Sequence, residues 1–161
     1  MISLVRVDNR LIHGQVVEAW LPHLKVSRLI VADDEAASSP LIRAAMALAV
    51  QSAIEVQILP LAQVDFPGIS LDPVKTLVLL RDVAAVPFAQ AHGLKVEHLN
   101  LGNVHFGTGR RQVSPSVFLA ESELRTLQRL AEEGVRVEAR AVPVEKPVEL
   151  AELQERWGKA G

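Results

Sequence analysis

The chain opens with the stretch Ile2-Ser3-Leu4-Val5-Arg6-Val7-Asp8-Asn9-Arg10-Leu11-Ile12-His13-Gly14-Gln15, in which an apolar run gives way to a dense polar loop. Residues 2–7 are short and rich in β-branched side chains, which is typical of a strand. From Gly14 to Leu21 the apolar residues fall on one helical stripe, and we expect Pro22 to end that helix. A strand that feeds a helix through a short loop is the opening unit of an α/β sheet.

The rest of the chain repeats this alternation of short apolar runs and helical patterns. Further strands are expected at residues 28–32, 54–59, 75–80, 96–101 and 135–139, and further helices at residues 41–50, 83–91, 121–133 and 149–156. Ser122 is the expected cap of the 121–133 helix, and residues 102–118 are expected to form a loop leading into one short strand, 112–119.

Several of these strands are apolar at nearly every position, which indicates that helices cover both of their faces. Strands and helices that alternate in this way are joined by right-handed crossovers. No repeat or linker divides the chain. We therefore predict a single α/β domain over residues 1–161, with an open, mainly parallel β-sheet and helices on both faces.

The composition excludes several classes of function. The formal net charge of −2 gives no basic surplus for binding nucleic acid, and the absence of cysteine excludes disulfides, zinc–thiolate sites and thiol catalysis. No apolar run approaches the roughly 20 residues needed to cross a bilayer. We expect a cytoplasmic protein that works at a membrane only by docking onto another protein.

The loop after the first strand carries the chemistry, because open α/β sheets bind ligands where strands end and helices begin. His13 has a neutral, nucleophilic form near pH 7, and its ring nitrogen can hold a phosphoryl group. Asp8 can orient the imidazole, and Arg10 offers a fork of donors for phosphate oxygens. Gly14 lets the backbone approach a bound group, and the amides of Gly14 and Gln15 point toward an anion at the helix start.

The other polar residues give weaker signals. His23, His92 and His98 are expected to be structural or surface residues, and no pair of histidines has the spacing of metal ligands. We expect neither a metal site nor a cofactor. His105 lies in a glycine-rich loop that should open at the same sheet edge as His13, and Arg110 follows it, so both are candidates for the phosphate or substrate site.

The first loop resembles the signature of a known family. Residues 6–16, Arg-Val-Asp-Asn-Arg-Leu-Ile-His-Gly-Gln-Val, followed by Trp20, look like the motif of the mannose/sorbose-type IIB components of the bacterial sugar phosphotransferase system. Residues 26–34, 99–103, 113–119 and 134–143 are similar to later parts of that family, in the same order. Asn9 stands where many relatives have a second aspartate, and residues 60–73 match no part of the family pattern.

The resemblance implies a phosphoryl carrier. Its histidine, here His13, would accept a phosphoryl group from a phosphohistidine of a separate IIA protein and pass it to a sugar held by the membrane subunits IIC and IID. The family's loop acid and arginine fall on Asp8 and Arg10, and Gln15 would lie toward the sugar. Such a protein would be cytoplasmic and associated with the membrane through IIC and IID. A homodimer is compatible with the sequence, but no feature argues for one.

Two alternatives remain at this point. The chain is also compatible with a IIB-like regulatory module that uses phosphorylation of His13 as a signal. A histidine-phosphatase-type hydrolase places an arginine directly before its histidine, where this chain has Ile12, and that difference disfavours it. Nucleotide binding is disfavoured because no glycine-rich loop follows the first strand.

Overall fold

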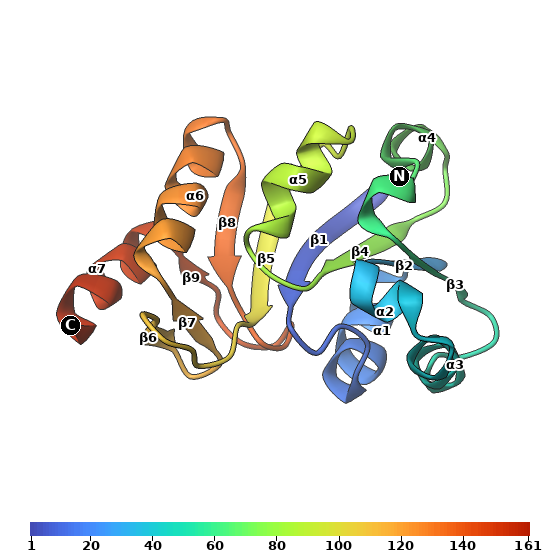
Figure 1. Cartoon of the computed structure of the whole chain (residues 1–161), viewed down its shortest axis with the longest axis horizontal. Coiled ribbons are helices and arrows are strands. Elements are labelled where there is room, and N and C mark those ends of the chain that lie inside the picture. Colours follow the sequence, from blue (N-terminus) through green and yellow to red (C-terminus); the bar gives the residue numbers. More distant parts are fainter.

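A computed structural model describes the whole chain, residues 1–161. Seven strands form one twisted sheet in the order β3-β2-β4-β1-β5-β8-β9 (Figure 1). Their bounds are β1 Ile2–Asp8, β2 Arg28–Ala32, β3 Glu55–Leu59, β4 Thr76–Leu80, β5 His98–Asn103, β8 Arg136–Ala139 and β9 Val148–Glu149. Every pairing is parallel except that of β8 with β9. The predicted open, mainly parallel α/β sheet is confirmed.

Helices cover both faces of this sheet. They are η1 Val16–Trp20, α1 Leu21–Leu24, α2 Asp34–Ser38, α3 Pro40–Ala49, η2 Leu61–Gln63, α4 Phe66–Leu71, α5 Ala85–Ala91, α6 Glu121–Glu132 and α7 Leu150–Ala160. Alternate strand residues enter two separate cores. The larger core packs under α4, α5, α6 and α7, and the smaller one under η1, α1 and α2. None of the helices has the length and apolar content that crossing a membrane would require.

The expectation that Pro22 ends the first helix was wrong. The helical segment runs on through Leu24, with Pro22 in the first turn of α1, and it ends at Lys25 in the left-handed conformation. The preceding segment, η1, is a π-helical turn in which Leu21 N–H donates to Val16 O. A proline is tolerated here because the wider turn removes the i→i−4 bond that proline would otherwise break.

Two further local expectations were wrong. Residues 102–118 do not lead into one strand but form an antiparallel hairpin, β6 Arg111–Ser114 with β7 Val117–Leu119, outside the main sheet. Pro115 and Ser116 make the turn that splits the expected strand. Ser122 lies inside the first turn of α6, whose N-cap is Ala120, and Glu123 caps the helix by accepting from Ala120 N–H at 2.9 Å.

The proline-rich section at residues 60–73 contains η2 and α4. Phe66 and Ile69 of α4 are buried in the larger core, and Asp65 caps the helix by accepting from Gly68 N–H. The short elements α2 and β9 were also missed, because five residues and two residues carry too little periodicity to be recognised.

The order of the strands determines where a ligand is expected. The chain leaves β1 toward β4, β2 and β3, whereas it leaves β5 toward β8 and β9, so the connections diverge between the neighbouring strands β1 and β5. Such a switch point opens a crevice at the carboxyl ends of the two strands. The loops after Asp8 and after Asn103 meet there, and Asn9 N–H donates to Asn103 O at 3.0 Å.

Candidate functional site

The first loop turns sharply at the end of β1. Leu11 N–H donates to Asp8 O at 2.9 Å, and Arg10 N–H donates to Asp8 Oδ1 at 2.9 Å, so one aspartate holds the turn through both its backbone and its side chain. Leu11 adopts a left-handed φ of 55°, which is costly for leucine, yet its side chain is buried in the smaller core. Core packing therefore fixes the strained turn that presents Arg10 and His13.

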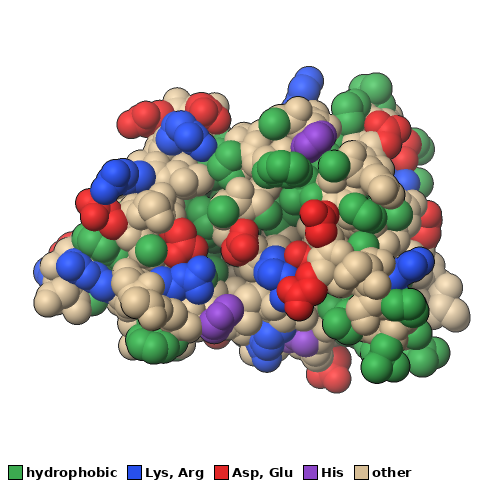
Figure 2. Space-filling model, in the orientation of Figure 1, with side chains coloured by type: hydrophobic (Ala, Val, Ile, Leu, Met, Phe, Trp, Pro, Cys, Tyr) green, Lys and Arg blue, Asp and Glu red, His purple; other side chains and the backbone are tan.

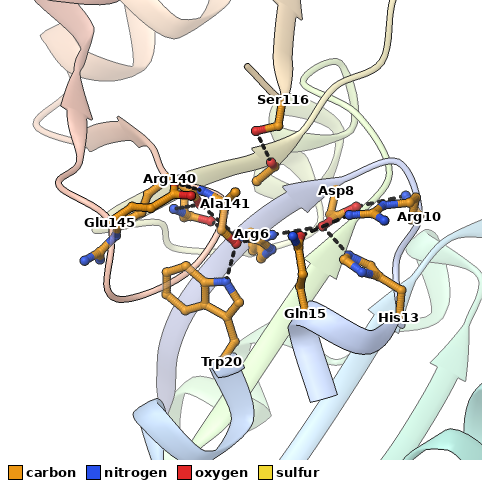
Figure 3. A network of polar contacts seen from close by, with 12 residues as sticks. Arg6, Asp8, Arg10, His13, Gln15, Trp20, Ser116, Arg140, Ala141 and Glu145 are labelled. Carbon is orange, nitrogen blue, oxygen red and sulfur yellow. Dashed lines mark hydrogen bonds and ion pairs between the residues drawn. The ribbon is translucent and has the colours of Figure 1, made fainter. Parts of the chain in front are cut away.

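His13 contacts the buried carboxylate of Asp8. Its Nε2 lies 2.7 Å from Asp8 Oδ2, the side chain of Asp8 is fully buried, and that of His13 is 13% exposed (Figure 3). The structure thus places Asp8 where the sequence analysis expected an orienting acid. Nδ1 of His13 has no hydrogen-bond partner in the chain.

The pKa of Asp8 decides which ring nitrogen of His13 carries the proton. Burial alone would raise the pKa of Asp8, but the hydrogen bond from His13 and the positive charge of Arg6 outweigh burial and hold this pKa below its ordinary value. Asp8 is therefore ionised at neutral pH and only accepts hydrogen bonds. Nε2 must carry the ring proton of neutral His13, which leaves the lone pair of Nδ1 free.

Arg10 is exposed, and its partners in the chain are uncharged. Its Nη2 donates to Gln15 Oε1 at 3.0 Å. With the amide of Asn103 turned to satisfy its neighbours, Asn103 Oδ1 accepts from Arg10 Nε and Nη2, both at 2.7 Å. No carboxylate forms an ion pair with Arg10 in this structure, so its full charge remains available to an anion.

The helix that follows His13 starts with free amides. Its first hydrogen bond runs from Val17 N–H to His13 O at 3.0 Å, and the N–H groups of Gly14, Gln15 and Val16 have no acceptor in the chain. A Cβ atom at Gly14 would meet nothing within 4 Å, so there is open space beside the backbone here. Free amides, an unneutralised arginine and a histidine with a free ring nitrogen form a site suited to a phosphoryl group.

The two further candidates make no hydrogen bond or ion pair with this cluster. His105 is exposed, and its only hydrogen bond is made by its backbone oxygen, which accepts from Arg110 Nη1. Arg110 makes a two-pronged ion pair with Glu123, with Nε–Oε1 at 2.9 Å and Nη2–Oε2 at 3.1 Å. The assignment of both side chains to the site stays a prediction. Figure 2 shows histidine and basic side chains together along the lower edge of the molecule, below the carboxyl ends of β1 and β5.

No group of three or more acidic or histidine side chains in the chain has the arrangement of a metal site.

Sequence reasoning missed a buried row of polar residues beneath the loop. Arg6 of β1, Asn100 of β5 and Glu138 of β8 are direct cross-strand neighbours, and all three are fully buried. Arg6 Nη2 donates to Asp8 Oδ2 at 3.0 Å, and Asn100 Nδ2 lies 3.4 Å from Glu138 Oε1. Trp20 is buried in the smaller core and also donates from Nε1 to Ala141 O at 2.9 Å.

The available sequence signal was Arg6 itself. An arginine in an apolar strand, two residues before Asp8 and hence on the same strand face, is a charge that burial forces to find a partner. The cross-strand register that adds Asn100 and Glu138 cannot be obtained from the strands one at a time.

Comparisons with known proteins agree on one family. The family model described as the sorbose subfamily IIB component of the PTS system matches residues 2–160. The N-acetylgalactosamine-specific phosphotransferase enzyme IIB component 2 of Escherichia coli K12 is 30% identical over 153 residues, covering 94% of this chain and 98% of the relative. The sorbose-specific EIIB component of Lacticaseibacillus casei is 28% identical and covers 99% of both chains.

Solved structures show the same fold. The IIBSor domain of the sorbose permease from Klebsiella pneumoniae superposes with a TM-score of 0.86 at 24% identity, over 96% of this chain and 97% of that one. The N-acetylgalactosamine-specific IIB component 1 of Escherichia coli gives a TM-score of 0.85 at 26% identity, over 92% and 99%. The similarity extends over the whole α/β sheet and is not confined to the first loop.

Proposed function

The chain belongs to the sorbose subfamily of phosphotransferase-system IIB components, and on that premise we propose that Nδ1 of His13 is the atom that carries the phosphoryl group. A IIB component is a phosphotransferase that takes part in sugar uptake, and this is the activity of the chain. Because the chain belongs to this family, the alternative of a histidine-phosphatase-type hydrolase is excluded. The observation that carries the proposal is the contact of His13 Nε2 with ionised Asp8, which leaves Nδ1 as the free nucleophile.

The chemical step follows from that tautomer. The lone pair of Nδ1 attacks the phosphorus of a donor phosphohistidine whose other ring nitrogen carries a proton. The new N–P bond forms, and the donor's N–P bond breaks to release a neutral imidazole that keeps this proton. The ring of His13 gains positive charge while its proton stays on Nε2. The carboxylate of Asp8, 2.7 Å away, stabilises that charge without taking the proton.

The oxygens of the phosphoryl group need positive partners while they pass between two proteins. Arg10 supplies an exposed guanidinium with no carboxylate attached, and the amides of Gly14 and Gln15 supply two further donors. Gln15 orients Arg10 through its side-chain oxygen. Transfer in this arrangement depends on positioning and charge stabilisation and requires no metal ion.

The partners follow the family pattern. We assign the donor role to a phosphohistidine IIA protein and the acceptor role to a sugar held by membrane subunits IIC and IID, so that the chain works at the membrane surface by docking. One relative, the mannose-specific EIIAB component of Escherichia coli K12, is matched by this chain over 48% of its length. The relatives' names cover N-acetylgalactosamine, mannose, fructose and sorbose, so no single sugar is favoured.

The proposal is tested by phosphotransfer from several phosphorylated IIA proteins to the wild type, His13→Ala and His105→Ala. We expect the wild type and His105→Ala to acquire a phosphate that is acid-labile and base-stable, and His13→Ala to remain unlabelled. Labelled His13→Ala would refute the assignment of the carrier. A wild type that stays unlabelled, with every donor tried, would refute the carrier role of His13.

A further inference from the structure

Arg6 is the most deeply buried arginine of the chain, and its guanidinium donates a hydrogen bond to Asp8. We propose that Arg6 is a positioning residue that forces Asp8 to be a pure hydrogen-bond acceptor and so locks His13 in the tautomer with a free Nδ1. This inference rests on the proposed function, because it explains how His13 comes to present the nitrogen assigned to the phosphoryl group.

Donors occupy three of the four acceptor positions of the Asp8 carboxylate, including both on Oδ2, the oxygen that contacts His13. Oδ2 accepts from Arg6 Nη2 at 3.0 Å and from His13 Nε2 at 2.7 Å, and Oδ1 accepts from the backbone N–H of Arg10 at 2.9 Å. A proton on Oδ2 would displace one of the two donors that this oxygen accepts from. Arg6 cannot turn its N–H into an acceptor, so Asp8 stays ionised and the ring proton of His13 stays on Nε2.

The surroundings of Arg6 fix its position. Nη1 donates to the side-chain oxygen of Asn100 and, at 3.1 Å, to Arg140 O, and Nη2 donates to Ala141 O at 3.1 Å. The guanidinium lies over the ring of Trp20, with Cζ 4.9 Å from the centroid. On its other side lies Gly102, where a Cβ atom would overlap the guanidinium. These contacts fix the guanidinium of Arg6 in an orientation that points toward Asp8 (Figure 3).

The charge of Arg6 is balanced mainly by Asp8. Its other three partners are an amide oxygen and two backbone carbonyls, which carry no net charge. The neighbouring charged groups are Arg10 and Arg140, and Arg140 is itself paired with Glu138 at 3.0 Å. Removing the charge of Arg6 would therefore leave Asp8 as a buried carboxylate without an ion-pair partner. His13 would then be the one titratable side chain that still contacts it.

An isolated buried carboxylate takes up a proton more readily than an ion-paired one. Without Arg6, Asp8 would bind a proton from solvent and donate it in a hydrogen bond to Nε2 of His13. The ring proton would then sit on Nδ1, and the lone pair needed for attack on phosphorus would be lost. Arg6 acts in this way only through Asp8 and never touches the phosphoryl group.

The test reads the ring nitrogens of His13 by ¹⁵N NMR in Arg6→Met and Arg6→Lys, with Arg28→Met as the matched control. Arg28 is the other buried arginine of the sheet, bound to Thr76 and Asp72 at the start of β2, far from His13 in the fold. In the wild type, the neutral ring of His13 should show Nε2 protonated and Nδ1 unprotonated. Arg6→Met should show the proton on Nδ1 and phosphotransfer slowed by about 100-fold or more.

The other variants separate charge from folding. Arg6→Lys, which keeps the charge, should retain the Nε2–H tautomer, and Arg28→Met should lose stability without changing the tautomer. If Arg6→Met does not fold, Arg6→Gln, which is neutral but keeps a donor group, replaces it with the same expected tautomer. A neutral variant at position 6 that keeps Nε2–H, or an equal change in Arg28→Met, would overturn the inference.

The tautomer is read without any donor protein. A wild type that shows Nε2–H but is never phosphorylated on His13 would therefore refute the proposed function and leave the role of Arg6 standing.

Discussion

Asp8→Asn tests the account at the residue on which most of the site depends. The carboxylate accepts three hydrogen bonds, from Arg6, His13 and the backbone of Arg10, at 3.0, 2.7 and 2.9 Å. An asparagine offers one oxygen and one NH₂ group, so whichever way the amide is turned, its NH₂ faces a donor. With the oxygen toward Arg6 and His13, the backbone N–H of Arg10 loses its acceptor; with the amide reversed, Arg6 and His13 both lose theirs.

The expected loss of stability follows from these contacts. Breaking one side of a buried ion pair costs about 3–5 kcal/mol, and Arg6 keeps three neutral acceptors, so we expect the lower end, about 3 kcal/mol. The unsatisfied N–H of Arg10 adds about 1 kcal/mol. The chain should therefore remain folded but lose about 3–4 kcal/mol of its free energy of unfolding.

The effect on phosphotransfer should exceed the effect on folding. Asparagine neither stabilises positive charge on the ring of His13 nor fixes its tautomer, and losing an orienting aspartate slows histidine-mediated transfer by about 10²–10⁴-fold. The assays are urea unfolding, and rapid-quench phosphotransfer from a phosphorylated IIA protein. Asp33→Asn is the matched control, because Asp33, like Asp8, accepts a hydrogen bond from a backbone N–H and pairs with an arginine, Arg81, at the carboxyl edge of the sheet. Unlike Asp8, it contacts no histidine.

Asp33→Asn should be less stable than the wild type. It should still transfer phosphate within about threefold of the wild-type rate, since it leaves the Asp8–His13 contact intact. An Asp8→Asn variant that is as stable as wild type and transfers phosphate equally fast would refute the reasoning about Asp8.

Three further predictions concern the same region. Arg10→Gln should change the free energy of unfolding by no more than about 0.5 kcal/mol, because the side chain is exposed, but should slow phosphotransfer by about 10-fold or more; equal rates in the two proteins would show that Arg10 does not bind the phosphoryl group. Gly102→Ala should destabilise the protein by about 1–3 kcal/mol in urea unfolding, because the added methyl group meets the guanidinium of Arg6; an unchanged midpoint would contradict this packing. The folded-state pKa values of Asp8 and Glu138 lie below their ordinary values of 3.8 and 4.5, against the opposing effect of burial. The contribution of these two carboxylates to stability is therefore complete above about pH 5 and is lost as pH falls through the lowered pKa values. Urea unfolding at pH 7, 5, 4 and 3 should show this loss of stability in the wild type and a smaller loss in Glu138→Gln.

The chemistry of the first loop could be predicted because its residues are contiguous. Asp8, Arg10 and His13 lie within six positions, directly after a strand, and the fold brings them to the switch point between β1 and β5. The contact of Asp8 with His13 was expected and is present at 2.7 Å. The alternation of strands and helices was also sufficient to predict the sheet, since several of its strands are apolar at nearly every position.

Some features of the site could not be predicted from the sequence, because they depend on the register between strands and on which of several partners a side chain binds. The row formed by Arg6, Asn100 and Glu138 joins residues up to 132 positions apart and exists only through the pairing of β1, β5 and β8. The guanidinium of Arg110 is a group that can bind phosphate, but it forms an ion pair with the carboxylate of Glu123 at the start of α6. The continuation of the helix beyond Pro22 required a π-helical turn that no sequence rule anticipates.

The proposed function depends on phosphorylation of His13 at Nδ1. The most direct measurement is to phosphorylate the wild-type chain with a IIA protein and to identify the modified atom by ¹H–³¹P correlation NMR, with the residue assigned by tandem mass spectrometry under alkaline conditions. We expect a single phosphohistidine, at His13, bonded through Nδ1. A phosphoryl group on Nε2 of His13, or on any other histidine, would contradict it.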